Sequence, residues 1–382
     1  MMETTTHESR RKPPWLARAA YTLGDVDGDG HEATTHRWIA ARVAALLEFP
    51  YGGAWPAVAP VTPSYLIPRA TLSGREQAAA FAVAAEDDLF GGWVPSSWMA
   101  TKAIMHPLVS RDAEAPADWT AGLAREGMSL ALRGHTAFSA PDALAAGRRL
   151  TDSGPVRVKP ANADGGRGQV VARTGAELER AVASLCEGGR LTDILTLEEQ
   201  LDRIETFSVG QARLPGRTIS YCGTQSATVN NDGESAYGGS TLFLVRGGFD
   251  RLLARDLPPD MRAAIARAIA FDRLADSHIP GLIASRRNYD VAIGVGADGA
   301  RRAGVLEQSW RVGGATAAEI LALEAFARDP GIAVVHARTV EVYGEAAGLP
   351  QGAVVYYQGH DPVAGPLTKY ACVERTIEGQ CA

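Results

Sequence analysis

VRVKPANADGGRGQVVAR, residues 156–173, is the stretch that decides which fold this sequence predicts. Val156 and Val158 alternate with Arg157 and Lys159, so we expect a strand that presents both cations on one face. A glycine-rich loop follows, and the apolar residues of QVVAR then predict a second strand. The stretch therefore predicts a hairpin, and the question is whether its loop binds an anion.

The loop of this hairpin contains Gly165, Gly166, Arg167 and Gly168. Because glycine has no Cβ, it lets backbone amides come close to an anion such as a phosphate. The segment is not a P-loop, since the pattern GxxxxGK followed by Ser or Thr is absent and no helix is predicted after the glycines. By itself, the hairpin is as consistent with a plain turn as with phosphate binding.

The composition is that of an ordinary globular protein. A chain of 382 residues is long enough for two or three domains, and its formal net charge of −6 argues against a nucleic-acid partner bound through its phosphates. No run reaches the roughly 18 apolar residues of a membrane span, and the polar N-terminus lacks the apolar stretch of a signal peptide. We therefore expect a cytoplasmic protein that binds neither nucleic acid nor membrane.

Predicted strands and helices alternate along the chain, which indicates an α/β or α+β fold. Thr174 with Glu177, and Thr316 with Glu319, have the spacing of capping boxes and predict two helix starts. Further helices are expected at residues 39–47 and from residues 258–260 onward, and strands at 18–23, 64–68, 193–201, 288–295 and 303–310.

The order of four segments resembles that of the ATP-grasp enzymes over residues 100–320. These segments are Lys159 in VKP, the glycine-rich hairpin, the later EEQL and the strand VLEQSW. VKP and GGRG look like the matching segments of biotin carboxylase, and the spacing from Glu198 to Glu205 resembles that of D-alanine–D-alanine ligase. LEQSWRVGGAT is similar to the E-x-N-x-R-x-G-G-x-T pattern of peptide ligases of the pheganomycin type.

The resemblance implies a nucleotide site. Two lysines of the family hold the α- and β-phosphates; Lys159 matches the second, and Lys102 in ATKAIMHPL is the best match to the first, although it also fits a solvated helix residue. Ammonium groups suit this task because they act as point charges. The hinge would bind adenine through Glu198 and the segment Gln200–Leu201, and Glu205 would bind the ribose. EEQLDRIE could also start a surface helix, but the preceding ILTL is too apolar for that.

The resemblance also implies a magnesium site on two strands. Asp290 in RRNYDVAIG and Glu307 in GVLEQSW match the two carboxylates of the family, and carboxylate oxygens suit Mg²⁺. The third position, which is Asn in the family pattern, is Ser309 here, and it shares a strand face with Glu307. A hydroxyl is a weaker metal ligand than an amide oxygen, so we expect a second Mg²⁺ to be loosely held or bound through water. The alternative is that the carboxylates only pair with nearby arginines.

Two arginines, Arg287 and Arg311, are expected to flank these carboxylates. A guanidinium fork fits a transferred phosphoryl group or a substrate carboxylate, so both are candidate catalytic residues. The loop at residues 228–240, which contains Tyr237 and Ser240, is equally consistent with an acceptor-binding loop and with an ordinary surface loop.

The sequence therefore predicts an α+β protein with the ATP-grasp fold. We expect an ATP- and Mg²⁺-dependent ligase that joins a small-molecule carboxylate to an amine through an acyl phosphate, and a homodimer is left open. A small-molecule kinase of the same fold and a nucleotide-binding regulatory protein are the alternatives. The expected segments are a disordered N-terminus (1–14), a small α/β N-terminal domain (15–100), a lid domain (101–202), a C-terminal catalytic domain (203–345) and terminal strands (346–382).

Overall fold

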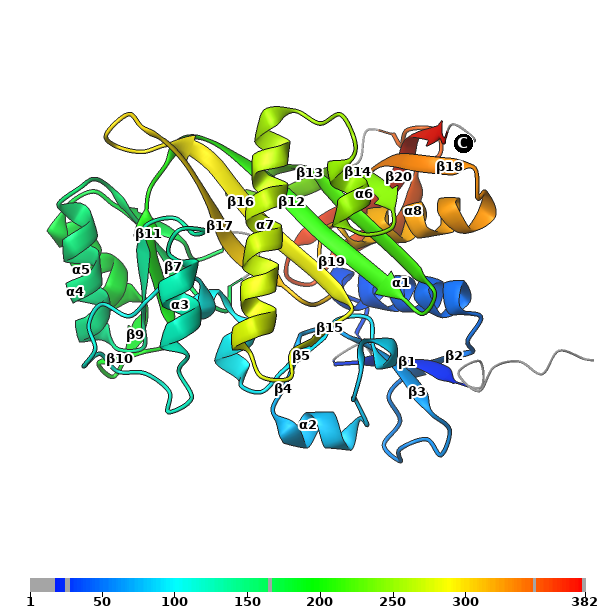
Figure 1. The fold of residues 1–382 in the computed structure, drawn as a ribbon, viewed down its shortest axis with the longest axis horizontal. Coiled ribbons are helices and arrows are strands. Elements are labelled where there is room, and N and C mark those ends of the chain that lie inside the picture. The colour runs from blue at the N-terminus through cyan, green and yellow to red at the C-terminus, as the bar shows by residue number, and fades with distance from the viewer. Residues whose placement is uncertain (1–17, 25–27, 164–166, 346–347, 380–382) are drawn as a thin grey trace, which may run out of the picture.

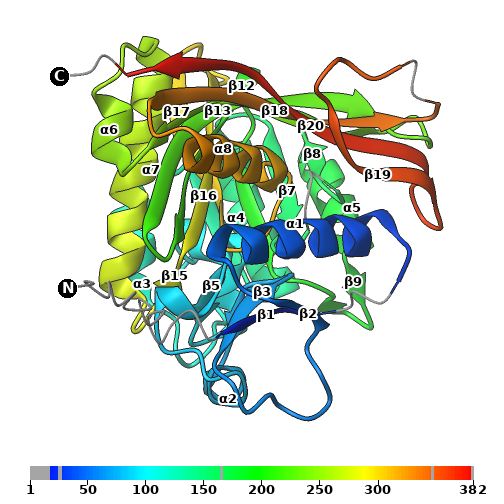
Figure 2. The same cartoon turned by 90° about the vertical axis from the view of Figure 1, so that its right-hand side faces the viewer.

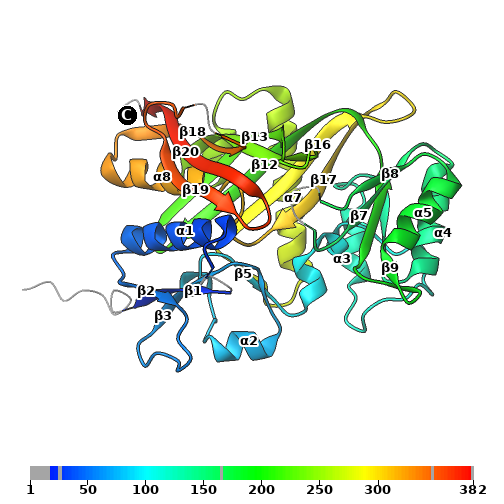
Figure 3. The same ribbon diagram turned by 180° about the vertical axis from the view of Figure 1, so that it is seen from behind.

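An eight-stranded sheet forms the centre of the molecule in the computed structural model, which describes residues 18–24, 28–163, 167–345 and 348–379. The long helix α7 (Pro259–His278) crosses one face of this sheet, and α8 (Thr316–Arg328) and α1 (His31–Leu47) lie on the other face (Figure 1, Figure 3). A separate α/β unit stands at one end of the sheet, and a small N-terminal sheet lies below α1 (Figure 2).

The N-terminal part is a three-stranded parallel sheet in the order β2-β1-β3, built around β1 (Ala19–Leu23). The predicted apolar stripe of α1 is buried: Ile39 and Val43 pack in one core with residues of β3 and α8. The helix ends at Glu48, which has a left-handed backbone with φ 58°. The other elements up to residue 105 are β2 (Tyr51–Ala54), β3 (Ser64–Pro68), β4 (Leu72–Ser73), α2 (Arg75–Ala80), η2 (Glu86–Asp88), β5 (Gly92–Val94), η3 (Ser97–Ala100) and η4 (Lys102–Met105).

We call the α/β unit at the end of the large sheet the lid. Its four-stranded antiparallel sheet has the order β6-β11-β7-β8, and the quoted stretch forms the hairpin of β7 (Val156–Pro160) and β8 (Val170–Ala172). Thr174 caps the helix after it, since its hydroxyl accepts from the Glu177 amide at 3.2 Å. The other elements are α3 (Ala121–Gly127), β6 (Gly134–Ala137), α4 (Ala140–Thr151), α5 (Gly175–Ser184), β9 (Cys186–Glu187), β10 (Arg190–Leu191) and β11 (Leu195–Glu199).

The strands of the large sheet follow the order β17-β16-β12-β13-β14-β18-β20-β19, and every neighbouring pair is antiparallel. The two last strands, β19 and β20, belong to this sheet. The elements are β12 (Asp202–Leu214), β13 (Arg217–Val229), β14 (Ser235–Arg246), α6 (Phe249–Leu253), β15 (Ile283–Ala284), β16 (Arg286–Val295), β17 (Arg301–Ser309), β18 (Ile332–Tyr343), β19 (Val354–Asp361) and β20 (Gly365–Glu378). The short β15 joins β5 and β4 in a further sheet.

Each face of the large sheet has its own core, and the fold class is the predicted one, α+β. Ile265 and Phe271 of α7 are fully buried against one face, and Ile320 and Phe326 of α8 are buried against the other. Within the described part of the chain, no helix is long and apolar enough to cross a membrane.

Candidate functional site

The inner face of the lid sheet carries a buried lysine, Lys159, beside a buried carboxylate, Glu198. The alternation predicted for β7 is confirmed, because Val156 and Val158 lie in the lid core while Lys159 on the other face forms an ion pair with Glu198 of β11. His106 Nε2 lies 3.3 Å from the second oxygen of Glu198. Burial by itself would raise the pKa of Glu198, but Lys159 and His106 lower it to about 2, so this carboxylate is charged.

In the hinge segment EEQL, Glu198 and Glu199 end the buried strand β11, and Gln200 and Leu201 connect it to β12, so the segment is not the start of a surface helix. Arg157, the other cation of the quoted stretch, donates through Nε to Gln200 Oε1 at 2.9 Å. Gln200 in turn bonds through its side chain to the carbonyl of Leu201, which is buried. The two inner strands of the lid sheet thus pair Lys159 with Glu198, and Arg157 of the same strand β7 binds Gln200.

Lys102 links the lid to the large sheet. It begins η4 and is only 6% exposed, so it is not a solvated helix residue. Its Nζ lies 2.8 Å from Glu307 Oε2 of β17 and also donates to the carbonyl of Ala163, in the loop that follows β7. The two candidate phosphate-binding lysines therefore each pair with a candidate site carboxylate.

Asp290 and Glu307 face one another across two neighbouring strands. The register of β16 and β17 pairs Asp290 with Glu307 and Asn288 with Ser309, so all four side chains stand on one face of the sheet. Burial, and then the nearby Glu307 carboxylate, raise the pKa of Asp290. Its buried Oδ1 has no hydrogen-bond partner among the described residues.

This arrangement fits a divalent cation, because an unpartnered carboxylate oxygen beside a second carboxylate is a costly state that a cation relieves. No group of three or more His, Cys, Asp or Glu side chains that could hold a metal occurs in the described residues. A cation at Asp290 and Glu307 would therefore need further oxygens from elsewhere. Mg²⁺ is commonly held in this way, by one or two carboxylates together with the phosphates of a substrate.

A second buried cation, Arg286, stands on the same face of β16 as Asp290. Its Nη2 lies 2.7 Å from Glu319 Oε1, and its Nη1 donates to the carbonyl of Arg311. The guanidinium groups of Arg286 and Arg311 flank Gly313, since a Cβ placed there would lie 3.8 Å from each. The predicted capping box of Glu319 is wrong: its side chain is fully buried and binds Arg286 instead of the helix start.

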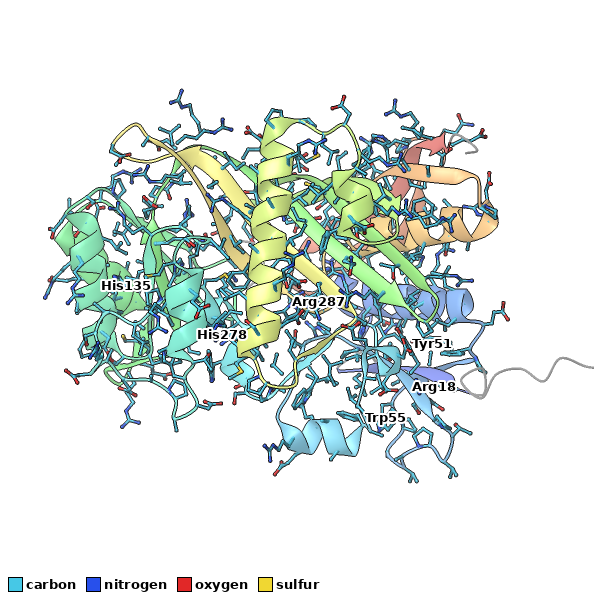
Figure 4. All side chains as sticks on the ribbon, viewed as in Figure 1. Arg18, Tyr51, Trp55, His135, His278 and Arg287 are labelled. Atoms are coloured by element: carbon cyan, nitrogen blue, oxygen red, sulfur yellow. The ribbon has the colours of Figure 1, made fainter. Side chains whose placement is uncertain are left out.

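Arg287 does not join this cluster, which corrects the placement expected from the sequence. It points to the opposite face of β16, toward α7, where Figure 4 labels it. Its Nη1 lies 2.9 Å from Asp272 and 2.8 Å from Asp276, and its Nη2 lies 3.2 Å from Glu86. Burial by itself would lower the pKa of Arg287, but Asp272 and its neighbours raise it above its usual value. Three protein carboxylates thus satisfy this cation.

Glu205 also lies away from the other candidate residues. It belongs to the same face of β12 as the buried Phe207, which packs in the core beside α7. There it lines a surface cavity of about 200 Å³ together with Arg203, Asp260 and Arg301. The structure therefore does not bring Glu205 to the face that carries Asp290.

The tip of the lid hairpin is described only in part. Gly165 and Gly166 lie outside the described residues, while Gly168 has the left-handed φ of 68° that favours glycine. Arg167 Nη2 lies 3.6 Å from Glu32 Oε1 in the first turn of α1. The hairpin loop thus reaches the N-terminal part of the molecule.

The predicted acceptor loop is the β-hairpin of β13 and β14. Tyr237 bonds through its hydroxyl to Ser240 at 2.6 Å and to Thr339 at 3.2 Å. A Cβ on Gly314 would lie only 2.6 Å from the Tyr237 ring, so the loop after β17 can pack here only with glycine. Tyr237 therefore stands beside the same glycine pair that follows Arg311.

Further along this face lies a polar group that the sequence reasoning missed. Lys369 Nζ lies 2.8 Å from Glu341 and 3.3 Å from His31 Nδ1, and the backbone amide of His31 donates to Asp361 Oδ2 at 2.7 Å. The missed residues on this face of the sheet are Arg286, Asn288, Glu341 and Lys369. Strand alternation from Asp290 could have found Arg286 and Asn288, but no local signal marks Glu341 or Lys369.

Comparison with known proteins identifies the family and the fold. The model for the family described as "Protein of unknown function (DUF3182)" matches residues 21–371, and the chain belongs to this family. No curated protein matches the sequence. The structure is similar to that of the biotin carboxylase of Campylobacter jejuni, solved as a β-γ-ATP complex, with a TM-score of 0.51 and 10% identity over 94% of this chain and 88% of the other.

A second solved structure gives the same result. The biotin carboxylase domain of the 2-oxoglutarate carboxylase of Hydrogenobacter thermophilus, solved with MgADP, ADP and bicarbonate, has a TM-score of 0.50 and 13% identity, and the match covers 93% of this chain and 86% of that chain. The predicted fold is therefore confirmed: the chain has the ATP-grasp fold.

Proposed function

We propose that this protein, whose fold is that of the ATP-grasp enzymes, binds ATP with Mg²⁺ between the lid sheet and the large sheet and uses it to join a carboxylate to an amine. The observation that carries the proposal is the pair of buried lysines. Lys159 is held by Glu198 on the lid, and Lys102 is held by Glu307 on β17. Buried lysines facing carboxylates at a junction of two units suit the binding of an anion that bridges them.

The nucleotide contacts follow from this placement. The ammonium groups of Lys102 and Lys159 would bind phosphates, and the hairpin loop with Gly165, Gly166, Arg167 and Gly168 would cover them. The main chain at Gln200 and Leu201, where the lid sheet meets β12, is the segment that we propose for the adenine edge. Glu198 would act chiefly by holding Lys159 in place, because Lys159 and His106 already engage its two oxygens.

The ligands of the two similar structures support ATP, Mg²⁺ and a carboxylate-like substrate. One was solved as a β-γ-ATP complex and the other with MgADP and bicarbonate. In this chain, Asp290 and Glu307 would hold Mg²⁺, and Asp290 Oδ1 lacks a partner among the described residues. When bound, Mg²⁺ would supply positive charge that offsets the charge on the phosphates.

The protein groups then have positioning and charge-neutralising tasks. A carboxylate oxygen of the substrate attacks the γ-phosphorus, the bond from that phosphorus to ADP breaks, and an acyl phosphate forms. An amine nitrogen next attacks the acyl carbon, phosphate leaves, and the amine loses a proton. We propose Arg311, beside Gly313 and Arg286, as the group that stabilises the charge moving during transfer.

The test is the capture of the acyl phosphate. Purified protein is incubated with ATP, Mg²⁺, hydroxylamine and a panel of small carboxylic acids, and ADP and hydroxamate are measured together. We expect one class of acids to give hydroxamate in step with ADP. A stable phosphorylated alcohol without hydroxamate would assign a kinase instead, and nucleotide binding without ADP release from any acid would assign a regulatory protein.

A further inference from the structure

We infer that Asn288 is a third protein ligand of the cation at Asp290 and Glu307, and that its Oδ1 supplies the amide oxygen that Ser309 cannot. This inference rests on the proposed function. Asn288 is 8% exposed and stands on β16 directly opposite Ser309, in the register that pairs Asp290 with Glu307. The four side chains therefore occupy neighbouring positions of two strands on one face of the sheet.

A hydrogen-bond relay determines the positions of the oxygen and the nitrogen of the Asn288 amide. Arg286 donates to both oxygens of Glu319, through Nε at 2.9 Å and Nη2 at 2.7 Å. Tyr221 donates its hydroxyl proton to Glu319 Oε1 at 2.6 Å, because a charged carboxylate can only accept.

The next step of the relay follows from the last. Since the proton of Tyr221 is used, its oxygen can only accept, and the atom of Asn288 that lies 3.1 Å away must be the NH₂ group. The same Nδ2 donates to Ser208 Oγ at 2.7 Å. Both partners lie on β12 and β13, so the amide nitrogen points toward those strands and the oxygen is turned away from them, toward the side of β17.

The sheet is built to admit this relay. Gly210 of β12 pairs with Asn288 on one side and with Tyr221 on the other. A Cβ at Gly210 would overlap the Tyr221 hydroxyl group, so glycine lets the phenol lie across β12 and reach Asn288. Within the described residues, Asn288 Oδ1 itself has no hydrogen-bond partner. A fixed amide with a spare oxygen beside a carboxylate pair is a preformed oxygen donor for a hard cation.

The experiment measures metal binding without turnover. Mn²⁺ replaces Mg²⁺, ADP replaces ATP, and free Mn²⁺ is followed by electron paramagnetic resonance during titration of the full chain. Asn288→Ala should weaken Mn²⁺ binding at least about tenfold, a loss that even supporting residues of metal sites can cause. Ser309→Asn in the wild-type background should change the affinity little, but in the Asn288→Ala background it should restore most of it.

Two further variants separate ligation from folding. Ser208→Ala removes a partner of the Asn288 nitrogen and leaves the oxygen, so its Mn²⁺ affinity should stay within about twofold of wild type. Asn288→Thr keeps a hydroxyl that can bond to Tyr221 but has no amide oxygen, and it should lose affinity as Asn288→Ala does. Asn288→Thr also replaces Asn288→Ala as the test variant if the alanine variant does not fold.

The outcomes separate the inference from the proposed function. If wild type binds ADP and Mn²⁺ but both Asn288 variants bind Mn²⁺ equally well, Asn288 is not a ligand, and the proposed function stands. If Ser208→Ala loses as much affinity for Mn²⁺ as Asn288→Thr, Asn288 acts only through its hydrogen bonds to Ser208 and Tyr221, and the inference is wrong. If wild type binds neither ADP nor Mn²⁺, both proposals are overturned.

Discussion

The two faces of β16 carry neighbouring arginines with different surroundings. Toward α7, three carboxylates surround Arg287, and Asp272 also accepts from Tyr289 at 2.5 Å. On the opposite face, which α8 covers, Arg286 pairs with Glu319 of α8, while Asp290, further along the same face of β16, keeps an oxygen without a partner among the described residues. On the face toward α7 the charged groups are paired within the protein. On the opposite face a carboxylate oxygen is left for a ligand.

This difference separates stability from function along a single strand. Removing one partner of a buried ion pair strongly lowers the free energy of unfolding, because the other charge is left buried and unpaired. A buried carboxylate that is left unsatisfied lowers stability in the free protein, and such a cost persists at sites that bind something. Changes on the face of β16 toward α7 should therefore affect unfolding, and changes on the face that carries Asp290 should affect catalysis.

The largest effect is expected from Arg287→Ala. It leaves the 7%-exposed Asp272 without its cation, so the free energy of unfolding should fall by about 3–5 kcal/mol, measured by urea denaturation. The affinity of the remaining folded protein for ATP with Mg²⁺ should not change. Arg251→Ala, at a side chain that is 72% exposed, is the control and should stay within about 0.5 kcal/mol. A lost affinity with normal stability would show that Arg287 belongs to the site after all.

Asp290→Asn should show the reverse pattern. We expect the rate of ADP release to fall by about 10²–10³-fold, because a charge that should stabilise the reacting phosphates through the cation is lost. The melting temperature should not fall, since the change removes the repulsion between Asp290 and Glu307. Asp256→Asn, at an exposed residue, is the matched control. A stability loss as large as that of Arg287→Ala would erase the difference between the two faces.

Arg311→Ala should lower the rate of hydroxamate formation by on the order of a hundredfold, the typical effect of losing one preorganised donor. The affinity for ATP should change only a few-fold, because the guanidinium acts on charge that develops during transfer. Arg311→Lys should recover part of the rate, since it keeps the charge but not the fork. Equal losses in rate and in ATP affinity would assign Arg311 to nucleotide binding only.

The smallest expected effect is measured with Lys159→Ala. A nucleotide at a hundred times its dissociation constant stabilises a folded protein by about 2.7 kcal/mol, which for a chain of this size raises the melting temperature by about 3 °C. This shift should vanish in the variant. Because the change also leaves Glu198 unpaired, the shift is compared in Lys159→Ala combined with Glu198→Gln. An unchanged shift of the melting temperature in this double variant would show that Lys159 does not bind the phosphates.

Most of the fold could be predicted from sequence because its signals are local. The alternation in VRVK, the apolar ILTL before the hinge and the Pro-Pro-Asp start of α7 each specify one element. Alternation also placed Glu307 and Ser309 on one face. The same rule, counted from Asp290, puts residues 288 and 286 on that face and Arg287 on the other.

Other features depend on contacts that no local pattern records. Glu319 has the spacing of a helix cap, yet it serves Arg286, which is 33 residues away in the chain. Glu205 has the expected spacing from the hinge, but it shares the face of Phe207 because β12 enters the sheet in that register. Lys369 pairs with Glu341 of the neighbouring strand, and its other partner, His31, comes from the opposite end of the described sequence and meets it only in the folded molecule.

The bond from the His31 amide to Asp361 joins positions that are 330 residues apart, and this separation bears on how the protein is made. A ribosome releases the chain from its N-terminus, so α1 emerges long before β19 and β20 exist. The hydrogen bond from the first turn of α1 to Asp361 can therefore form only after Asp361 has left the exit tunnel. Contacts between residues so far apart in the chain form slowly. The strands β19 and β20, which complete one edge of the large sheet, are therefore synthesised after α1 and after the lid.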